Sequence, residues 1–496
     1  MTAAAERTPA ERKPAATRRD RTLKEPRRRE RFDAVTLLTV YLVLLYAIPS
    51  NVTIDALNSL GRPSLLWGVV LMVFWTLSRL QRHYGDPRPI RQPVRFAFAL
   101  LFVIALVSFT AALLRGQPAD QVSPAFTALV RLMSWAGVVL VAVDGIRTMT
   151  DFVRITRRIA IAAGLLAALG ILQFLTKQTI VDFFNLVPGL SSSGGGVVER
   201  GGVTRASGTA IHPLEYATTL IGAFPIVIAA AISHGFRWHH SKVMLRWWAP
   251  VAAIVISALV GVSRSAIIGF FVAAVAMIPA IPRRYRAGVV AGAVLLIAVV
   301  VAALPGLLST TVALFTGAGT DPSTQSRVGG LDRAPEFIGA SPVFGVGFGT
   351  FLPRYYIFDN AWVLMTVELG ILGVAAFAGV VVSSVWSALV ARRQSGHDDV
   401  RLLGYSLAVS MLAMAIMFAF FDGLSFPISA GTLFLVAGLC GSLRNIGATD
   451  AWLNAGGRPR RDLAEGARDP AADDRELRAE RPRATRGREP GASGSG

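Results

Sequence analysis

The sequence predicts an all-α integral membrane protein with about twelve transmembrane helices and one large extracytoplasmic loop between the ninth and tenth spans. Of its 496 residues, 53% are hydrophobic and the mean hydropathy is +0.52, which is too apolar for a soluble globular protein. Repeated apolar windows of about 18 residues or more are each long enough to cross a bilayer. Lysine and arginine alternate from loop to loop between these windows, as in polytopic membrane proteins.

The predicted spans account for most of the chain between residues 33 and 443. They lie near residues 33–49, 64–79, 96–114, 126–143, 159–176, 213–232, 248–262, 265–281, 287–306, 361–386, 402–420 and 427–443. The longest break between them is the loop 307–360. Because polar chemistry has to collect where the chain leaves the bilayer, this loop and the span after it are the first place to look for a site.

The basic residues test this topology, because cytoplasmic loops are rich in lysine and arginine. With the N-terminus in the cytoplasm, the predicted cytoplasmic loops hold eighteen of these residues, and the outer loops, although longer in total, hold nine. We therefore predict that both termini are cytoplasmic and that loop 307–360 faces outward.

One pair of spans depends on a break near Arg264. Residues 248–281 could form one long tilted helix, or two shorter helices that meet at Gly261-Val-Ser-Arg-Ser265. A single helix would place the arginine-poor loop 307–360 in the cytoplasm, against the positive-inside rule. The sequence therefore favours two helices, with the break at the outer surface.

Two polar tails flank the membrane domain of residues 33–443. Residues 1–32 contain Arg18-Arg-Asp-Arg21 and lack apolar periodicity, so we expect a disordered basic tail close to an anionic membrane surface. Residues 444–496 are rich in Arg, Asp, Glu, Pro, Gly and Ala, and predict a second disordered cytoplasmic tail. The basic residues behind the net charge of +19 lie in the two tails and in the loops between spans. Membrane topology explains this distribution better than a nucleic-acid partner does. The lone Cys440 excludes disulfides and Cys-rich metal sites within the chain.

Charged residues near the outer ends of the spans are informative, because a charge near the membrane is costly unless it is paired or solvated. Arg205, His212 and Glu215 lie in a glycine-containing segment that leads into the sixth span. Arg205 is either a ligand contact or a solvated loop residue, and a proline-started helix explains His212 and Glu215 equally well. Arg264 has no acidic residue close in sequence, which favours an anionic partner over contact with lipid phosphates.

The long outer loop and the span after it carry further candidates. Arg327 follows a polar segment, and Asp359-Asn360 stands where the tenth span begins. Asp359 is a candidate general base, although Asp and Asn at this place are also typical helix caps. The run Gly345-Val-Gly-Phe-Gly349 predicts a hinge or a close-packed turn rather than a phosphate-binding fingerprint. Glu368, inside the span, is explained as a hydrogen-bonded structural carboxylate.

Arginines and carboxylates thus gather on one side of the predicted membrane, with Asp422 at the outer end of the last hairpin. Guanidinium forks suit phosphate groups and need no metal. A nearby carboxylate can act as a general base toward an acceptor hydroxyl. This combination fits transfer from, or transport of, a phosphate-bearing lipid at the outer face.

The order of the motifs carries a resemblance. It runs from Arg205-Ala-Ser-Gly-Thr209 and His212-Pro213 through Val262-Ser-Arg-Ser265 to Arg327, Ser341-Pro-Val-Phe-Gly-Val-Gly-Phe-Gly349, Asp359-Asn360 and Glu368-Leu-Gly-Ile-Leu-Gly373. This order resembles the O-antigen ligase/polymerase family of bacterial membrane glycosyltransferases. The resemblance covers residues 200–440 and lies in order and spacing rather than in any one motif.

The resemblance implies a GT-C-like helical fold in the bacterial cytoplasmic (inner) membrane. It also implies transfer of a saccharide from a polyprenyl-pyrophosphate-linked donor to a hydroxyl of a glycan or glycolipid acceptor, without a metal or another cofactor. The positions that match the family's pyrophosphate-binding arginines are Arg264 and Arg327, and we add Arg205 and His212 as substrate-binding residues. The family usually has histidine before the asparagine that ends the large loop. This chain has Asp359 there, and we expect it to act as the base, with ligase and polymerase both left open.

Two other functions fit the sequence. A transporter of a lipid-linked glycan or a small anion would line its path with the same arginines, but the chain shows no clear pair of discontinuous helices in matching halves. A non-catalytic scaffold in an envelope-synthesis complex would use the basic tails as docking segments.

Overall fold

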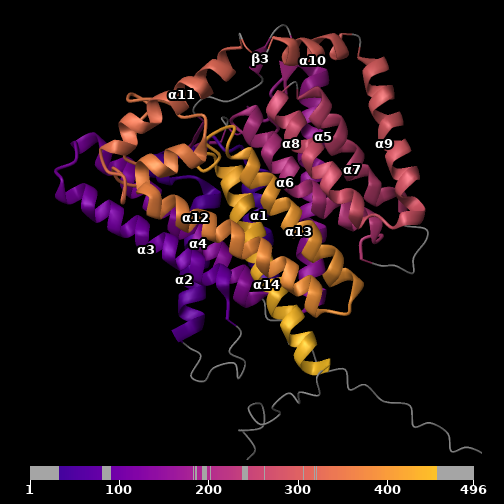
Figure 1. Ribbon diagram of the computed structural model, residues 1–496, viewed down its shortest axis with the longest axis horizontal. Helices are drawn as coiled ribbons and strands as arrows, with labels where there is room; N and C mark the ends of the chain where they lie inside the picture. Colours follow the sequence, from indigo (N-terminus) through magenta and orange to yellow (C-terminus); the bar gives the residue numbers. More distant parts are fainter. Residues whose placement is uncertain are drawn as a thin grey trace, which may run out of the picture.

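The structure is a computed structural model, which describes residues 33–454 except 81–90, 183, 185, 186, 193–197, 201, 202, 237–243, 262, 305, 318 and 320. It is a bundle of helices with two further helices, α10 and α11, lying across one end (Figure 1). The predicted tail 1–32 lies outside the described residues, as does most of the predicted tail 444–496.

The bundle helices follow the predicted spans closely. They are α1 (Ala34–Tyr46), α2 (Pro63–Leu80), α3 (Pro93–Leu114), α4 (Ala119–Gly145), α5 (Met149–Thr176), α6 (Pro213–Ile232), α7 (Met244–Val260), α8 (Arg264–Met277), α9 (Arg283–Ala303), α12 (Ala361–Gln394), α13 (Asp398–Met417) and α14 (Pro427–Asn454). Within the described part of the chain, nine of them are long and apolar enough to cross a membrane, and α1, α7 and α8 are shorter apolar helices. The predicted all-α membrane fold is therefore confirmed, whereas a total of twelve crossings depends on the three short helices.

Two boundaries deserve comparison with the sequence. The apolar stretch 248–281 forms two helices, as predicted, because α7 ends at Val260 and α8 begins at Arg264 after the extended residue Ser263. At the other end of the chain, α14 continues to Asn454, past residue 443, where the last span was expected to end.

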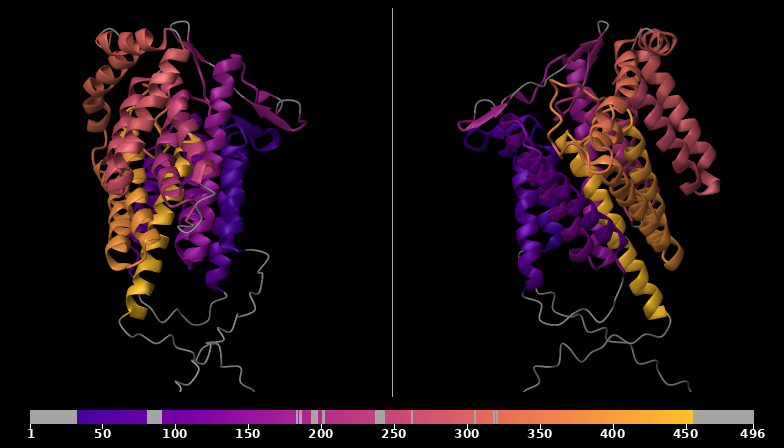
Figure 2. Two further views of the ribbon diagram at one scale, coloured as in Figure 1. Left: turned by 90° about the vertical axis from the view of Figure 1, so that its right-hand side faces the viewer. Right: turned by 60° about the vertical axis from the view of Figure 1, so that its left-hand side comes forward.

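We call the end of the bundle that carries α10 (Leu307–Thr316) and α11 (Pro322–Gly339) the loop face. The sequence predicted only a loop over residues 307–360, and the structure corrects this, since two helices occupy its first part. At the start of α11 the carboxylate of Asp321 accepts a hydrogen bond from the Ser323 N–H, and Pro322 fills the first helical position. Figure 2 shows both helices at the upper end of the bundle, with the short strands at the same end.

Four short strands lie at the loop face and were not predicted. Strand β1 (Val52–Ile54) pairs antiparallel with β2 (Leu190–Ser192), and β3 (Val198–Arg200) pairs with β4 (Val203–Arg205). Three residues are too few to show the alternation of apolar and polar side chains that identifies a strand in a sequence.

The core of the bundle lies around α6 and α14. In each of these helices 89% of the apolar window is buried, against 6% for α9. Figures 1 and 2 show α9 at the edge of the bundle, where Val294 and Leu295 are exposed. In a bilayer these side chains would contact lipid, so the exposed apolar surface of α9 fits a membrane location.

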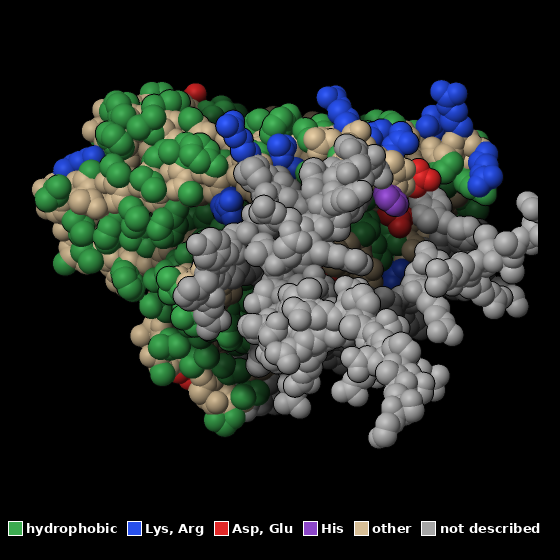
Figure 3. Space-filling model, turned by 90° about the horizontal axis from the view of Figure 1, so that it is seen from below, with side chains coloured by type: hydrophobic (Ala, Val, Ile, Leu, Met, Phe, Trp, Pro, Cys, Tyr) green, Lys and Arg blue, Asp and Glu red, His purple; other side chains and the backbone are tan. Residues whose placement is uncertain are grey.

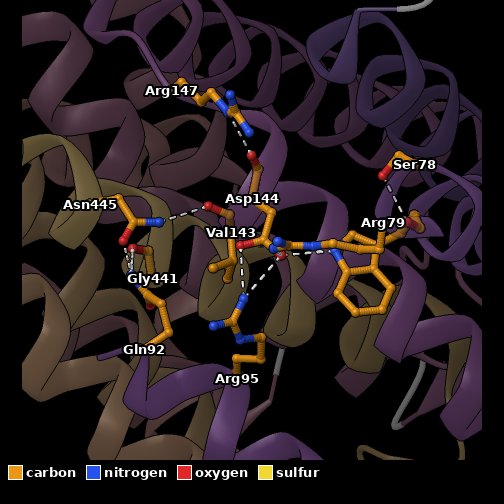
Figure 4. A network of polar contacts seen from close by, with 10 residues as sticks. Ser78, Arg79, Gln92, Arg95, Val143, Asp144, Arg147, Gly441 and Asn445 are labelled. Atoms are coloured by element: carbon orange, nitrogen blue, oxygen red, sulfur yellow. Dashed lines mark hydrogen bonds and ion pairs between the residues drawn. The ribbon is translucent and has the colours of Figure 1, made fainter. Parts of the chain in front are cut away.

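A polar network joins four helices near the end of the bundle opposite the loop face (Figure 4). Asp144, at the end of α4, forms ion pairs with Arg79 of α2 and with Arg95 of α3, the latter at 3.2 Å. It also accepts a hydrogen bond of 2.8 Å from the Trp75 indole. Asn445 of α14 donates to the Val143 carbonyl oxygen at 3.0 Å. Seen from this end, several Lys and Arg side chains stand out among the described residues (Figure 3).

Replacing Asp144 with asparagine should lower the free energy of unfolding by about 1–3 kcal/mol, because it leaves two guanidinium groups without their shared carboxylate. The measurement is the melting temperature of the purified protein in detergent. Asp33→Asn is the matched control. Asp33 pairs with Arg154 at 3.6 Å and both side chains are more than a third exposed, so its loss should change stability by less than about 0.5 kcal/mol. Equal melting temperatures for the two variants would contradict the assignment.

Candidate active site

A nine-residue connection between α13 and α14, which we call the aromatic loop (residues 418–426), organises the candidate site. Its backbone oxygens accept hydrogen bonds from two other segments. The N–H of Ala361, at the start of α12, donates to the carbonyl oxygen of Phe418 at 2.8 Å. The Arg327 Nε, from α11, donates to the carbonyl oxygen of Phe420 at 3.0 Å. The aromatic loop therefore fixes α11 and α12 relative to each other at the loop face.

Asp359 contacts the turn of α11 that carries Arg327. Ser326 precedes Arg327 on α11, and its hydroxyl donates to Oδ2 of Asp359 at 3.0 Å. The capping role that the sequence also allowed for Asp359 belongs to its neighbour, because the Asn360 side chain accepts from the N–H groups of Trp362 and Val363. Asp359 is half-buried, and the bond from Ser326 engages its Oδ2 atom.

His212 joins this group from the start of α6. Its Nδ1 accepts a hydrogen bond from the Leu214 N–H at 3.1 Å, so the histidine caps the helix. Its ring lies 5.7 Å from the ring of Phe426 in the aromatic loop. Burial and, after it, Arg205 lower the pKa of His212, which Asp359 raises and Arg327 lowers further. These influences place the imidazole within electrostatic reach of three other predicted site residues.

Arg205 acts electrostatically on His212, whereas Arg264 is bound to residues at the start of α11. Arg205 ends β4 and is buried, with 7% of its surface exposed. Arg264 forms an ion pair of 2.7 Å with Asp321 and donates to the Thr324 hydroxyl at 3.0 Å. Thr324 precedes Arg327 by three residues on α11, a rise of roughly 4.5 Å. The structure thus holds Arg205, Arg327 and Asp359 within electrostatic reach of His212, and it holds Arg264 about one turn away from Arg327 along α11.

The glycine run between Arg327 and Asp359 packs against a break in α12. Gly370 has φ +67° inside this helix, which interrupts its hydrogen bonding. Residues 342–347 fill the gap: the N–H of Gly347 donates to the Glu368 carbonyl oxygen at 3.0 Å, and Ile371 N–H donates to the Pro342 carbonyl oxygen at 2.9 Å. A Cβ at Gly345 would lie 2.2 Å from the Glu368 backbone, so the glycines permit a close-packed turn rather than a phosphate cradle.

Gly370→Ala should therefore destabilise the protein by about 2 kcal/mol or more, because a left-handed conformation is strained for alanine. Its Cβ would also meet the Val343 carbonyl oxygen at 2.2 Å. Gly379→Ala on the same helix has nothing within 4 Å of the new Cβ and should raise stability by about 0.5–1 kcal/mol. Melting temperatures of the two variants check this contrast, and a drop of equal size in both would contradict it.

The buried carboxylates at the loop face have structural partners. Glu215 accepts from the Ser50 hydroxyl at 3.1 Å and from the N–H groups of Ile211 and Ile428 at 3.0 and 2.7 Å. It thereby ties the starts of α6 and α14 together. Glu368 accepts from the Phe351 N–H at 3.4 Å. The structural explanation that the sequence offered for Glu215 and Glu368 is thus sufficient.

Ser326 and the aromatic loop are site components that the sequence analysis missed. Ser326 carries no charge, and the loop contributes backbone oxygens and phenyl rings, so neither gives a pattern that distinguishes it from ordinary loop sequence. The loop could have been found only through Asp422, which the sequence analysis did place at the outer end of the last hairpin.

Residues 249–378 match the family model described as O-antigen ligase. The matched segment includes Arg264, Arg327 and Asp359, and it ends before the aromatic loop. Arg205 and His212 lie outside it. No curated protein matches the chain.

Proposed function

We propose that the chain transfers a saccharide from a polyprenyl-pyrophosphate-linked donor to an acceptor hydroxyl at the outer face of the bacterial cytoplasmic membrane, and the match of residues 249–378 to the O-antigen ligase family model supports this proposal. Ligase and polymerase share this chemistry, and the proposal covers both. The observation that carries it is the meeting of Arg205, Arg327, His212 and Asp359, which come from three distant parts of the sequence.

In the proposed reaction, the acceptor hydroxyl attacks C1 of the donor sugar and the bond from C1 to the pyrophosphate oxygen breaks. Asp359 takes the proton of the hydroxyl, and Ser326 holds the carboxylate in place. Arg327 and Arg205 bind the pyrophosphate and stabilise the negative charge that develops as it leaves. His212 binds substrate beside them.

Arg264 has a supporting place in this proposal. Its ion pair with Asp321 holds the first turn of α11 against the start of α8. The same guanidinium retains donors for a second pyrophosphate oxygen, one turn from Arg327 along α11. Asp321 then acts as a counterion that keeps Arg264 oriented while the site is empty.

The proposed orientation puts the loop face outside the cell. The eighteen basic residues of the predicted cytoplasmic loops favour the opposite face for the cytoplasm. The described members of this group include Arg79, Arg95 and Arg147, which lie around the network of Figure 4. Both termini are then cytoplasmic, and the bundle is a GT-C-like scaffold for a site at its outer end.

The break in α12 bears on the transporter alternative. In transporters with broken helices, the freed backbone groups bind the substrate or the coupling ion. Here residues 342–347 occupy these groups, through Val346 N–H to the Val367 carbonyl oxygen at 3.0 Å and the bonds on either side of it. This observation favours a fixed wall for a transfer site.

Deleting the gene in its host tests the proposal at the level of the cell. We expect the lipid-linked saccharide to accumulate and the corresponding surface polymer to be shortened or lost. Complementation with the wild-type gene should reverse both effects, and complementation with Asp359→Asn should not. Unchanged polymer together with an unchanged pool of lipid-linked saccharide would contradict the proposal.

A further inference from the structure

A second basic pocket shares the aromatic loop with the candidate site. Its volume is about 320 Å³, including space open to solvent, and its lining includes Arg62, Ser64, Leu65, Arg131, Trp135 and Leu424. We call it the Arg62–Arg131 pocket. Leu424 of the aromatic loop faces this pocket, whereas Phe420 and Phe426 of the same loop contact Arg327 and His212. The aromatic loop therefore contributes residues to two arginine-containing sites.

Close packing of α2 on α4 sets the two arginines at one level. A Cβ at Gly137 would lie 2.2 Å from the Gly68 carbonyl oxygen, so the two backbones touch at this crossing. Arg62 precedes Gly68 by six residues and Arg131 precedes Gly137 by six, and both helices run away from the loop face. The two guanidinium groups are consequently brought to the same pocket from neighbouring elements.

The hydrogen-bonding capacity of these arginines is not used up within the protein. Among the described residues, the Nε atoms of Arg62 and Arg131 are both buried without a hydrogen-bond partner. Three carboxylates act on them electrostatically: Glu215 on Arg62, and Asp422 and Glu368 on Arg131. Each of these carboxylates accepts its hydrogen bonds from backbone or hydroxyl donors instead. A buried guanidinium N–H group without an acceptor is costly, which favours an anion as the missing partner of these Nε atoms.

The charges of Arg62 and Asp422, which both lie outside the spans, also favour a bound anion in this pocket. Burial and, after it, Arg131 lower the pKa of Arg62, so the two cations oppose each other's charge. Burial raises the pKa of Asp422, which limits its ability to neutralise Arg131. Ser64 follows Pro63 in the first turn of α2, where free N–H groups add to the attraction for an anion.

We propose that the Arg62–Arg131 pocket binds the phosphate group of a membrane lipid. Two guanidinium groups suit the oxygens of one phosphate. The apolar side chains of Leu65, Trp135 and Leu424 line the same pocket and suit the chain that follows a lipid headgroup. This site is additional to the proposed transfer site, and its occupancy is measured by binding alone, so its failure and the failure of the proposed function are distinguishable.

The test uses the full chain in nanodiscs of a zwitterionic phospholipid, with farnesyl monophosphate as the lipid probe and inorganic phosphate as the free probe. The rise in melting temperature with probe concentration gives a dissociation constant for each. All variants are made in an Arg327→Gln background, which weakens binding at the candidate site and is the same in every comparison. We expect Arg131→Gln and Arg62→Gln each to weaken farnesyl monophosphate binding roughly tenfold or more. Arg354→Gln, an exposed loop-face arginine paired with Asp120, should leave it unchanged.

Each outcome of this experiment either supports the proposal or contradicts it. Binding of inorganic phosphate with the same dependence on Arg62 and Arg131 would support the phosphate chemistry and identify free phosphate as a ligand. If Arg131→Gln does not fold, Arg131→Lys keeps the charge without the fork and should give an intermediate loss, while Arg62→Gln tests the opposite wall. Dissociation constants that Arg62→Gln and Arg131→Lys both leave unchanged, or no stabilisation of the Arg327→Gln parent by either probe, would overturn the proposal.

Discussion

Arg327→Ala should reduce glycan transfer by roughly 10²–10³-fold, because it removes a preorganised cationic fork from the charge that develops on the leaving pyrophosphate. The same change removes the Nε hydrogen bond to Phe420, which anchors α11 on the aromatic loop. The lost charge and the lost hydrogen bond both weaken the same pyrophosphate site. We therefore expect the reduction mainly in kcat/KM. The measurement is the initial rate of transfer by the purified variant.

Two controls separate charge from folding in this experiment. Arg333 lies on the same helix and is exposed, and its guanidinium carbon is 5.5 Å from the centre of the Tyr356 ring. Arg333→Ala should therefore change the rate of transfer by no more than about threefold. Arg327→Lys keeps the charge but loses the two-point geometry, and should recover part of the activity. Full activity in Arg327→Ala, with normal insertion and folding, would exclude Arg327 from the pyrophosphate site.

Asp359→Asn should lower kcat by roughly 10²–10⁴-fold, because the amide keeps the Ser326 contact but cannot accept the proton of the acceptor hydroxyl. Asn360→Ala is the matched control, since it removes the helix cap and should cost about 1 kcal/mol of stability with much smaller effect on kcat. A kcat in Asp359→Asn close to that of the wild type would rule out Asp359 as the base.

The substitution Asp359→His gives a second readout. An imidazole can also accept the proton of an acceptor hydroxyl, whereas an amide cannot. We therefore expect Asp359→His to retain more activity than Asp359→Asn, measured as the initial rate of transfer. Equal losses of activity in the two variants would contradict the assignment of Asp359 as the base.

The helical bundle could be predicted because membrane-length apolar runs and alternating basic loops are long-range signals that a single sequence carries. The break at Arg264 was predicted in the same way, from the side on which loop 307–360 had to lie. Helices α10 and α11 were not predicted, because α10 is apolar but short, and α11 contains two glycines and a proline in its interior. Their position depends on contacts such as the Arg264–Asp321 ion pair, which join residues far apart in the sequence.

The charged residues of the candidate site could be predicted from the sequence, but their arrangement in space could not. Arg205, His212, Arg327 and Asp359 are polar residues in the outer segments between apolar runs, and that is enough to single them out. The sequence could not show that Arg264 has an acidic partner, because Asp321 lies more than fifty residues away. Arg131 was overlooked because it lies inside an apolar run, although an ionisable residue within a span is itself a signal of function.

The most direct test of the central claim is turnover by the purified protein in proteoliposomes. The assay supplies a synthetic polyprenyl-pyrophosphate-linked oligosaccharide and a hydroxyl-bearing acceptor, and it measures both the extended acceptor and the polyprenyl pyrophosphate. The account predicts that the two products appear in equal amounts and that both disappear in Arg327→Ala and Asp359→Asn. Movement of the intact donor across the bilayer without either product would contradict it and identify a transporter.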